Sequence, residues 1–197
     1  LLVLVWVRFV ERRSLASIGL TRPGGSRIFA QGHLVGCGTI VLVVLAVWLT
    51  GGFDAQAYAP AWRSPRALLE IAILLPCFLV QASVEEIVFR GWMLSAVARK
   101  FNVAWAVALS SLIFCLLHYS PGQFWLVTLN LLLFGGFTCA WALRAGDIWG
   151  VMGWHAGWNW LLATGFQLPV TGIDLQLPAL LVALEPHGAD YLTGGSQ

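Results

Sequence analysis

The stretch ALLEIAILLPCFLVQASVEEIVFR, residues 67–90, determines what kind of fold this chain can form. Its first part carries one charged residue, Glu70, and then Glu85, Glu86 and Arg90 follow within six residues. A charged side chain at the centre of a bilayer costs about 2.5–3.5 kcal/mol on insertion scales, so such a cluster needs partners or a function. The stretch therefore predicts a membrane helix that carries an intramembrane functional site.

The composition of the whole chain is typical of a protein embedded in lipid. Of its 197 residues, 59% are hydrophobic and 10% are charged, and its mean hydropathy is +0.81. Soluble domains carry about 25% charged residues. The net charge of +2 is too small to indicate a nucleic-acid partner. The cysteines lie singly in apolar runs, where we expect small buried side chains rather than disulfides or a zinc cluster; they are Cys37, Cys77, Cys115 and Cys139.

Apolar runs predict an all-α, polytopic membrane bundle of six to seven transmembrane helices around a polar cavity. The expected spans are the end of a helix at 1–10, then 28–50, 67–98, 103–118, 123–143 and 148–166, followed by a weaker stretch at 175–184 that is short for a crossing. The span 67–98 is long enough to project from the membrane or to bend, with Pro76 as the expected kink. No linker or repeat interrupts the chain, so residues 1–197 are expected to form a single transmembrane domain whose first helix is truncated or processed.

Basic residues predict the orientation of the bundle. Eight of the eleven Lys and Arg residues fall in alternate loops: Arg8, Arg12, Arg13, Arg22, Arg27, Arg99, Lys100 and Arg144. The positive-inside rule makes these loops cytoplasmic. We therefore expect a multi-pass protein of the cell membrane, with the lipid bilayer as its surroundings and with no prediction of its oligomeric state.

Glu86 and Arg90 are four residues apart, so on a helix they face one another, whereas Glu85 points about 100° away. Arg90 would hold the Glu86 carboxylate in place, and Glu85 would be available as a general base. The alternative is purely structural: a buried ion pair with one spare carboxyl group, or a helix end among lipid headgroups.

The next span carries one ionisable group, His118, at its end. If the two spans form a helical hairpin that turns near residues 101–102, Glu85 and His118 are equally far from the turn. They would then lie at the same depth in the membrane on adjacent helices. A lone histidine at a span end is often only an interfacial residue, but polar groups inside a bundle tend to pair. We therefore predict that His118 lies beside Glu85.

The last long span adds His155 and Asn159, which lie four residues apart and project from one helix face. A structural interpretation makes them two hydrogen-bonded polar residues in a packing motif. Two small-xxx-small pairs would allow helices to approach closely: Gly32 and Gly36 in the second span, and Gly153 and Gly157 in this one.

Taken together, these residues resemble a known family. The order EExxxR, FxxxH and HxxxN, here Glu85 to Arg90, Phe114 to His118 and His155 to Asn159, is similar to that of the CAAX prenyl protease and bacteriocin-processing (CPBP, Abi) family of intramembrane proteases. The resemblance covers about residues 80–160 and extends to the connecting run: Asn130, Phe134, Gly135 and the turn Ala145-Gly146-Asp147-Ile148-Trp149.

The resemblance implies hydrolysis of a peptide bond in a membrane-anchored or lipidated protein or peptide. It also implies roles for six catalytic-site residues in three pairs: Glu85 and His118 activate a water, His155 and Asn159 stabilise the oxyanion, and Glu86 and Arg90 keep the site in shape. A general base contributes roughly 10²–10⁴-fold, and each preorganised oxyanion donor about 10²–10³-fold. No Ser or Cys has a base at matching helical spacing, so we expect a bound water rather than a covalent nucleophile.

The cofactor is either a divalent metal such as zinc or none. Two histidines and a carboxylate could supply the three ligands of a catalytic zinc, and the family is commonly described as metalloproteases. The familiar HExxH spacing is absent from the chain.

Two other functions use the same residue types. Intramembrane Glu, His and Arg also form the proton relays of transporters, but the repeated halves with broken helices that transporters often show are not found. A scaffold or immunity protein would keep the fold without turnover. The retention of all six polar residues favours the protease.

Overall fold

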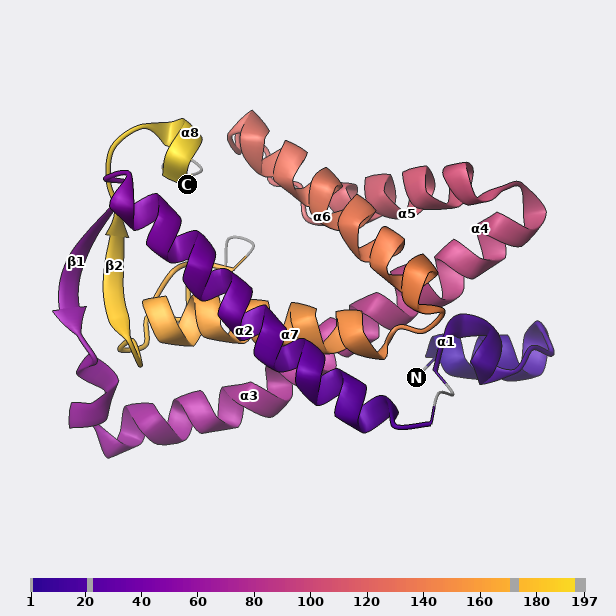
Figure 1. Ribbon diagram of the computed structural model, residues 1–197, viewed down its shortest axis with the longest axis horizontal. Coiled ribbons are helices and arrows are strands. Elements are labelled where there is room, and N and C mark those ends of the chain that lie inside the picture. Colours follow the sequence, from indigo (N-terminus) through magenta and orange to yellow (C-terminus); the bar gives the residue numbers. More distant parts are fainter. Residues whose placement is uncertain (1, 21–22, 171–173, 194–197) are drawn as a thin grey trace.

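The computed structural model describes residues 2–20, 23–170 and 174–193, and most of them are helical (Figure 1). Leu1 of the first predicted span and Arg22 of the first basic loop lie outside the described residues. The N-terminal half consists of α1 (Leu2–Val5), the π-helix η1 (Trp6–Val10), the 3-10 helix η2 (Leu15–Ile18), α2 (Gly25–Leu49), β1 (Phe53–Tyr58), η3 (Pro60–Arg63) and α3 (Pro65–Glu86). It is followed by the π-helix η4 (Ile87–Met93), α4 (Leu94–Lys100), α5 (Val103–Leu117), α6 (Trp125–Ala145), α7 (Trp149–Phe166), β2 (Val182–Pro186) and α8 (Asp190–Thr193).

The predicted all-α membrane bundle is confirmed, and each predicted span from 28–50 to 148–166 corresponds to helix. Within the described ranges, three helices are long and apolar enough to cross a membrane: α2, the continuous helix Pro65–Lys100, and α6. α5 is apolar but has only 15 residues. Three of the described helices meet both criteria, and the exact number of crossings, six to seven from the sequence, stays a prediction. That residues 1–197 form a single domain stays a prediction.

α7 lies at the centre of the bundle, with α2 and α3 packed along it (Figure 1). Most of its residues are buried by protein, which explains why a helix with Gly, Trp, His and Asn is stable there. α2 approaches α7 through glycines: a Cβ on Gly36 would lie 2.2 Å from the carbonyl oxygen of Trp154, and a Cβ on Gly157 would lie 2.2 Å from that of His33. The predicted glycine pairs thus bring two helix backbones into contact.

The third span is one continuous helix of 36 residues, Pro65–Lys100. At 1.5 Å per residue it is about 54 Å long, whereas a hydrocarbon core is about 30 Å thick. The α-helix continues through Pro76, and its geometry changes at η4 instead, directly after Glu86. Neighbouring groups in a membrane bundle can compensate for the hydrogen bond that a proline removes, and a bend of the helix at Pro76 stays a prediction.

A two-stranded antiparallel sheet lies at the end of the bundle away from the N-terminus (Figure 1). Phe53 of β1 pairs with Pro186 of β2, and Tyr58 pairs with Val182. β2 includes the end of the predicted weak span 175–184, and the described residues of that stretch form no helix. The stretch packs with α2 and α7 as an extended segment, because a partner strand far away in the sequence supplies its hydrogen bonds.

The basic segments meet at the other end of the molecule. Arg13 donates a hydrogen bond to Oγ of Ser95 on α4 at 2.8 Å, and the N–H of Ile148 donates to the carbonyl oxygen of Gly19 at 3.2 Å. The segment after η1 therefore contacts both α4 and the turn between α6 and α7. This is the end that the positive-inside rule assigns to the cytoplasm.

Candidate active site

Glu85, His118 and His155 converge from three helices, α3, the C-terminal end of α5, and α7. The hairpin between α4 and α5 turns at residues 101–102, as the sequence predicts. Nε2 of His118 and Nε2 of His155 each lie 3.8 Å from Oε2 of Glu85. This spacing is too long for direct hydrogen bonds but suits a single bridging water.

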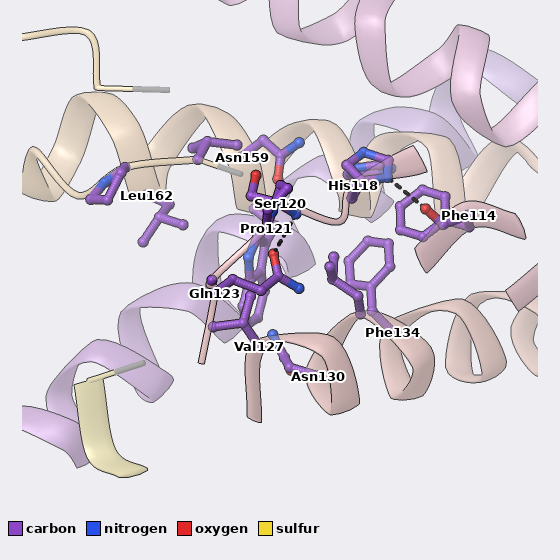
Figure 2. Close-up of a pocket in the computed structure, with 16 residues that line it drawn as sticks. Phe114, His118, Ser120, Pro121, Gln123, Val127, Asn130, Phe134, Asn159 and Leu162 are labelled. Carbon is purple, nitrogen blue, oxygen red and sulfur yellow. Dashed lines mark hydrogen bonds between the residues drawn. The ribbon is translucent and has the colours of Figure 1, made fainter. Parts of the chain in front are cut away.

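The other ring nitrogen of each histidine has a fixed partner. Nδ1 of His118 lies 2.8 Å from the carbonyl oxygen of Phe114, the contact that is dashed in Figure 2. Because a carbonyl can only accept, this Nδ1 carries the proton, and Nε2 of neutral His118 presents a lone pair. Nδ1 of His155 lies 2.8 Å from Oε1 of Glu86 and donates to that carboxylate. Both imidazoles are thus oriented with Nε2 toward Glu85.

Glu86 and Arg90 form a fully buried ion pair. Nη1 of Arg90 lies 3.2 Å from Oε1 of Glu86, and both side chains are 0% exposed. The Arg90 guanidinium lies over the ring of Phe114, with 4.4 Å from Cζ to the ring centroid, and Phe89 and Phe134 are also close. Three aromatic faces therefore stabilise a cation that has no contact with water.

Asn159 lies one turn beyond His155 and reaches the group through a residue that the sequence analysis missed, Gln81. Nδ2 of Asn159 lies 3.4 Å from Oε1 of Gln81, and the Gln81 amide nitrogen donates to Oε1 of Glu85. Gln81 precedes Glu85 by four residues and so occupies the same helix face. That spacing was the signal that could have identified it.

Two cavities flank this group of residues. The first, of about 500 Å³, is bounded by α5, α6 and α7 (Figure 2); its lining includes Phe114, His118, Asn130, Phe134, His155 and Asn159. The second, of about 470 Å³, lies between α3 and the end of α5; its lining includes Cys77, Phe78, Gln81, Glu85, Leu117 and His118. His118 lines both cavities, so the polar group forms the wall between them.

The residues do not fit a zinc ion, although their chemistry suits one. Two imidazole nitrogens and a carboxylate oxygen are ligands that zinc accepts. In a tetrahedral site with bonds of 2.0–2.1 Å, however, ligand atoms lie about 3.3 Å apart, whereas the distances here are 3.8 Å. Within residues 2–20, 23–170 and 174–193, no group of three His, Cys, Asp or Glu side chains has the spacing of a metal site.

Comparison with known proteins finds a similarity to one family. The family model described as Rce1-like, type II CAAX prenyl endopeptidase, matches residues 67–161, a segment that runs from α3 into α7 and contains all six predicted site residues. No curated protein and no solved structure matches the chain. The match agrees with the order of motifs in the sequence, and the family is one of membrane proteases. Residues 67–161 are therefore similar to the Rce1-like family.

Proposed function

We propose that this protein is an intramembrane endopeptidase that hydrolyses a peptide bond of a membrane-anchored or lipidated protein or peptide. The observation that carries the proposal is the position of Glu85, whose Oε2 lies 3.8 Å from Nε2 of both His118 and His155. A substrate with a prenylated CAAX end is the first candidate, because the family is named for that substrate. The cell membrane is the proposed location.

Glu85 and His118 would activate the attacking water. A water between Glu85 Oε2 and His118 Nε2 loses a proton to this pair while its oxygen adds to the carbonyl carbon of the peptide bond. Neutral His118 is suited to accept, because its Nδ1–H is directed to the carbonyl of Phe114 and the lone pair of its Nε2 faces Glu85. A general base of this kind contributes roughly 10²–10⁴-fold.

His155 and Asn159 would stabilise the oxyanion that forms on the carbonyl oxygen. Nδ1–H of His155 is committed to Glu86, so His155 offers an Nε2–H only as an imidazolium.

Collapse of the intermediate completes the reaction. The carbon–nitrogen bond breaks, and the departing amine takes up the proton that the Glu85–His118 pair received from the water. One water is consumed and the residues return to their starting protonation. Both halves of the step occur beside the first cavity, where His118, His155 and Asn159 are grouped.

Cleavage by protein reconstituted in lipid vesicles tests this proposal. The substrates are a farnesylated CAAX peptide, the same peptide without its lipid, and a peptide anchored by a transmembrane segment, with products identified by mass spectrometry. Glu85→Gln is expected to abolish cleavage. Glu70→Gln is the matched control, because Glu70 lies on the same helix, pairs with exposed Arg66 at 2.8 Å and lines neither cavity.

Three outcomes oppose the proposal. Full cleavage by Glu85→Gln means that this carboxylate is not the base. Ion-coupled uptake without cleavage by the wild type indicates a transporter. A folded wild-type protein that neither cleaves nor transports indicates a scaffold or immunity protein.

A further inference from the structure

We propose that Gln81 is a positioning residue that links Glu85 on α3 to Asn159 on α7. This inference rests on the proposed peptidase function and adds to it a residue outside the three sequence motifs. Gln81 donates to Oε1 of Glu85 and accepts from Nδ2 of Asn159. One amide side chain therefore contacts a member of the proposed water-activating pair and a member of the proposed oxyanion pair.

The orientation of the Gln81 amide follows from its two partners. A carboxylate can only accept hydrogen bonds, so the amide NH₂ of Gln81 faces Glu85 and the amide oxygen faces Asn159. The reverse orientation would place the amide oxygen against a carboxylate oxygen. The same reasoning turns the NH₂ group of Asn159, rather than its oxygen, toward Gln81.

This contact decides which oxygen of Glu85 is available. Oε1 is occupied by Gln81, whereas Oε2 is buried and has no hydrogen-bond partner among the described residues. Oε2 is also the atom that lies 3.8 Å from the two histidine Nε2 atoms. Gln81 therefore holds the carboxylate so that its free lone pairs face the position of the attacking water.

The contact with Gln81 also decides which N–H group of Asn159 is available. The side-chain amide of Asn159 has two N–H groups, and one of them is directed to Gln81 at 3.4 Å. The other is left for the oxyanion in the first cavity, which Asn159 lines. Because a fixed donor needs no reorientation as negative charge develops, this arrangement favours the transition state more than the bound substrate.

Gln81→Met tests the proposal, because it keeps the length of the side chain and removes both hydrogen bonds. With the best substrate of the vesicle assay, kcat is expected to fall about tenfold to a hundredfold while KM stays near that of the wild type. Gln31→Met is the matched control. Gln31 is exposed on α2 and lines neither cavity, so this variant is expected to keep the wild-type kcat.

A double-mutant cycle with Asn159→Ala separates positioning from a general structural role. If Gln81 acts through Asn159 and Glu85, Gln81→Met lowers kcat less in the Asn159→Ala background than in the wild type. Thermal unfolding of Gln81→Met is expected to match the wild type. If Gln81→Met is unstable, the near-isosteric variant Gln81→Glu tests the proposal instead. It places a second carboxylate against Glu85, so its kcat is expected to fall.

The outcomes distinguish this role from the function on which it rests. A wild type that cleaves, together with Gln81→Met at full kcat or with strictly additive effects in the cycle, overturns the role of Gln81 alone. A wild type that cleaves no peptide overturns the peptidase proposal and the role of Gln81 with it.

Discussion

Nδ1 of His155 donates a hydrogen bond to Oε1 of Glu86 at 2.8 Å, and this contact joins α7 to α3 inside the bundle. The two side chains are 4% and 0% exposed. The same carboxylate oxygen lies 3.2 Å from Nη1 of Arg90. Glu86 therefore binds the buried arginine and also sets the ring orientation of a histidine that faces the proposed reaction centre.

We predict that Glu86→Ala and Arg90→Ala each destabilise the fold. Each variant leaves a partner charge buried without compensation, which typically costs about 3–5 kcal/mol. Glu86→Ala should also release His155 and so reduce turnover in the molecules that remain folded. Thermal unfolding in detergent measures the first effect. A double variant, Glu86→Gln with Arg90→Met, removes both charges and should recover part of the lost unfolding temperature. An unchanged unfolding temperature in either single variant would contradict the pairing of Glu86 with Arg90.

We predict that Asn159→Ala lowers kcat by about 10²–10³-fold and leaves KM near that of the wild type. An oxyanion donor acts mainly in the transition state, so its loss affects turnover rather than binding. Steady-state cleavage in vesicles measures kcat and KM separately and so checks this prediction. A raised KM with normal kcat would show that Asn159 only binds substrate.

We predict that Gly36→Ala separates α2 from α7. The added Cβ would lie 2.2 Å from the carbonyl oxygen of Trp154, and forced overpacking typically costs about 1–3 kcal/mol. Because the next residue on α7 is His155, the displacement should also lower turnover. Gly38→Ala on the same helix is the control, since nothing lies within 4 Å of its added Cβ. Equal unfolding temperatures for the two variants would refute the close helix contact.

We predict that alkylation of Cys77 blocks cleavage. Cys77 is exposed and lines the second cavity together with Glu85, which is two helical turns away, whereas Cys115 and Cys139 are buried. N-ethylmaleimide should therefore inactivate the wild type, with adduct formation at Cys77 followed by mass spectrometry. Cys77→Ser should cleave normally and resist the reagent. Inactivation of Cys77→Ser at the wild-type rate would place the sensitive thiol elsewhere.

Acid is expected to loosen the segment that follows η1. The indole N–H of Trp92 is the main cause that lowers the pKa of Glu11 below its usual 4.5, and hydrogen bonds from Arg13 and Trp6 add to it against the opposing effect of burial. A lowered pKa in the folded state means that ionised Glu11 stabilises the fold above about pH 4.5, and that this contribution is lost as the pH falls further.

Comparison of the wild type with Glu11→Gln isolates this contribution. The unfolding temperature of the wild type should exceed that of the variant at pH 7, and the difference should shrink below about pH 4.5. A difference that is constant across this range would show that the charge of Glu11 does not stabilise the docked segment.

Local spacing explains what the sequence predicted correctly. Helix periodicity places Glu86 opposite Arg90, and counting residues on either side of the turn at 101–102 places His118 level with Glu85. The apolar runs predicted the helices because backbone groups inside a bilayer must be satisfied within the same segment. The position of the proposed catalytic group along the chain therefore follows from the sequence alone, whereas the role of each residue in it stays a prediction.

The tertiary structure decided what depends on contacts between distant segments. Glu86 binds His155 across 69 positions, Gln81 binds Asn159 across 78, and β1 provides the pairing partner that makes the end of the stretch 175–184 a strand. It also decided which nitrogen of each histidine faces Glu85 and made α7 the buried centre of the bundle rather than another lipid-facing span. Sequence determined which faces of each helix are polar, because periodicity is a property of one segment. Which polar faces meet is set by how the helices pack together, and no single segment contains that information.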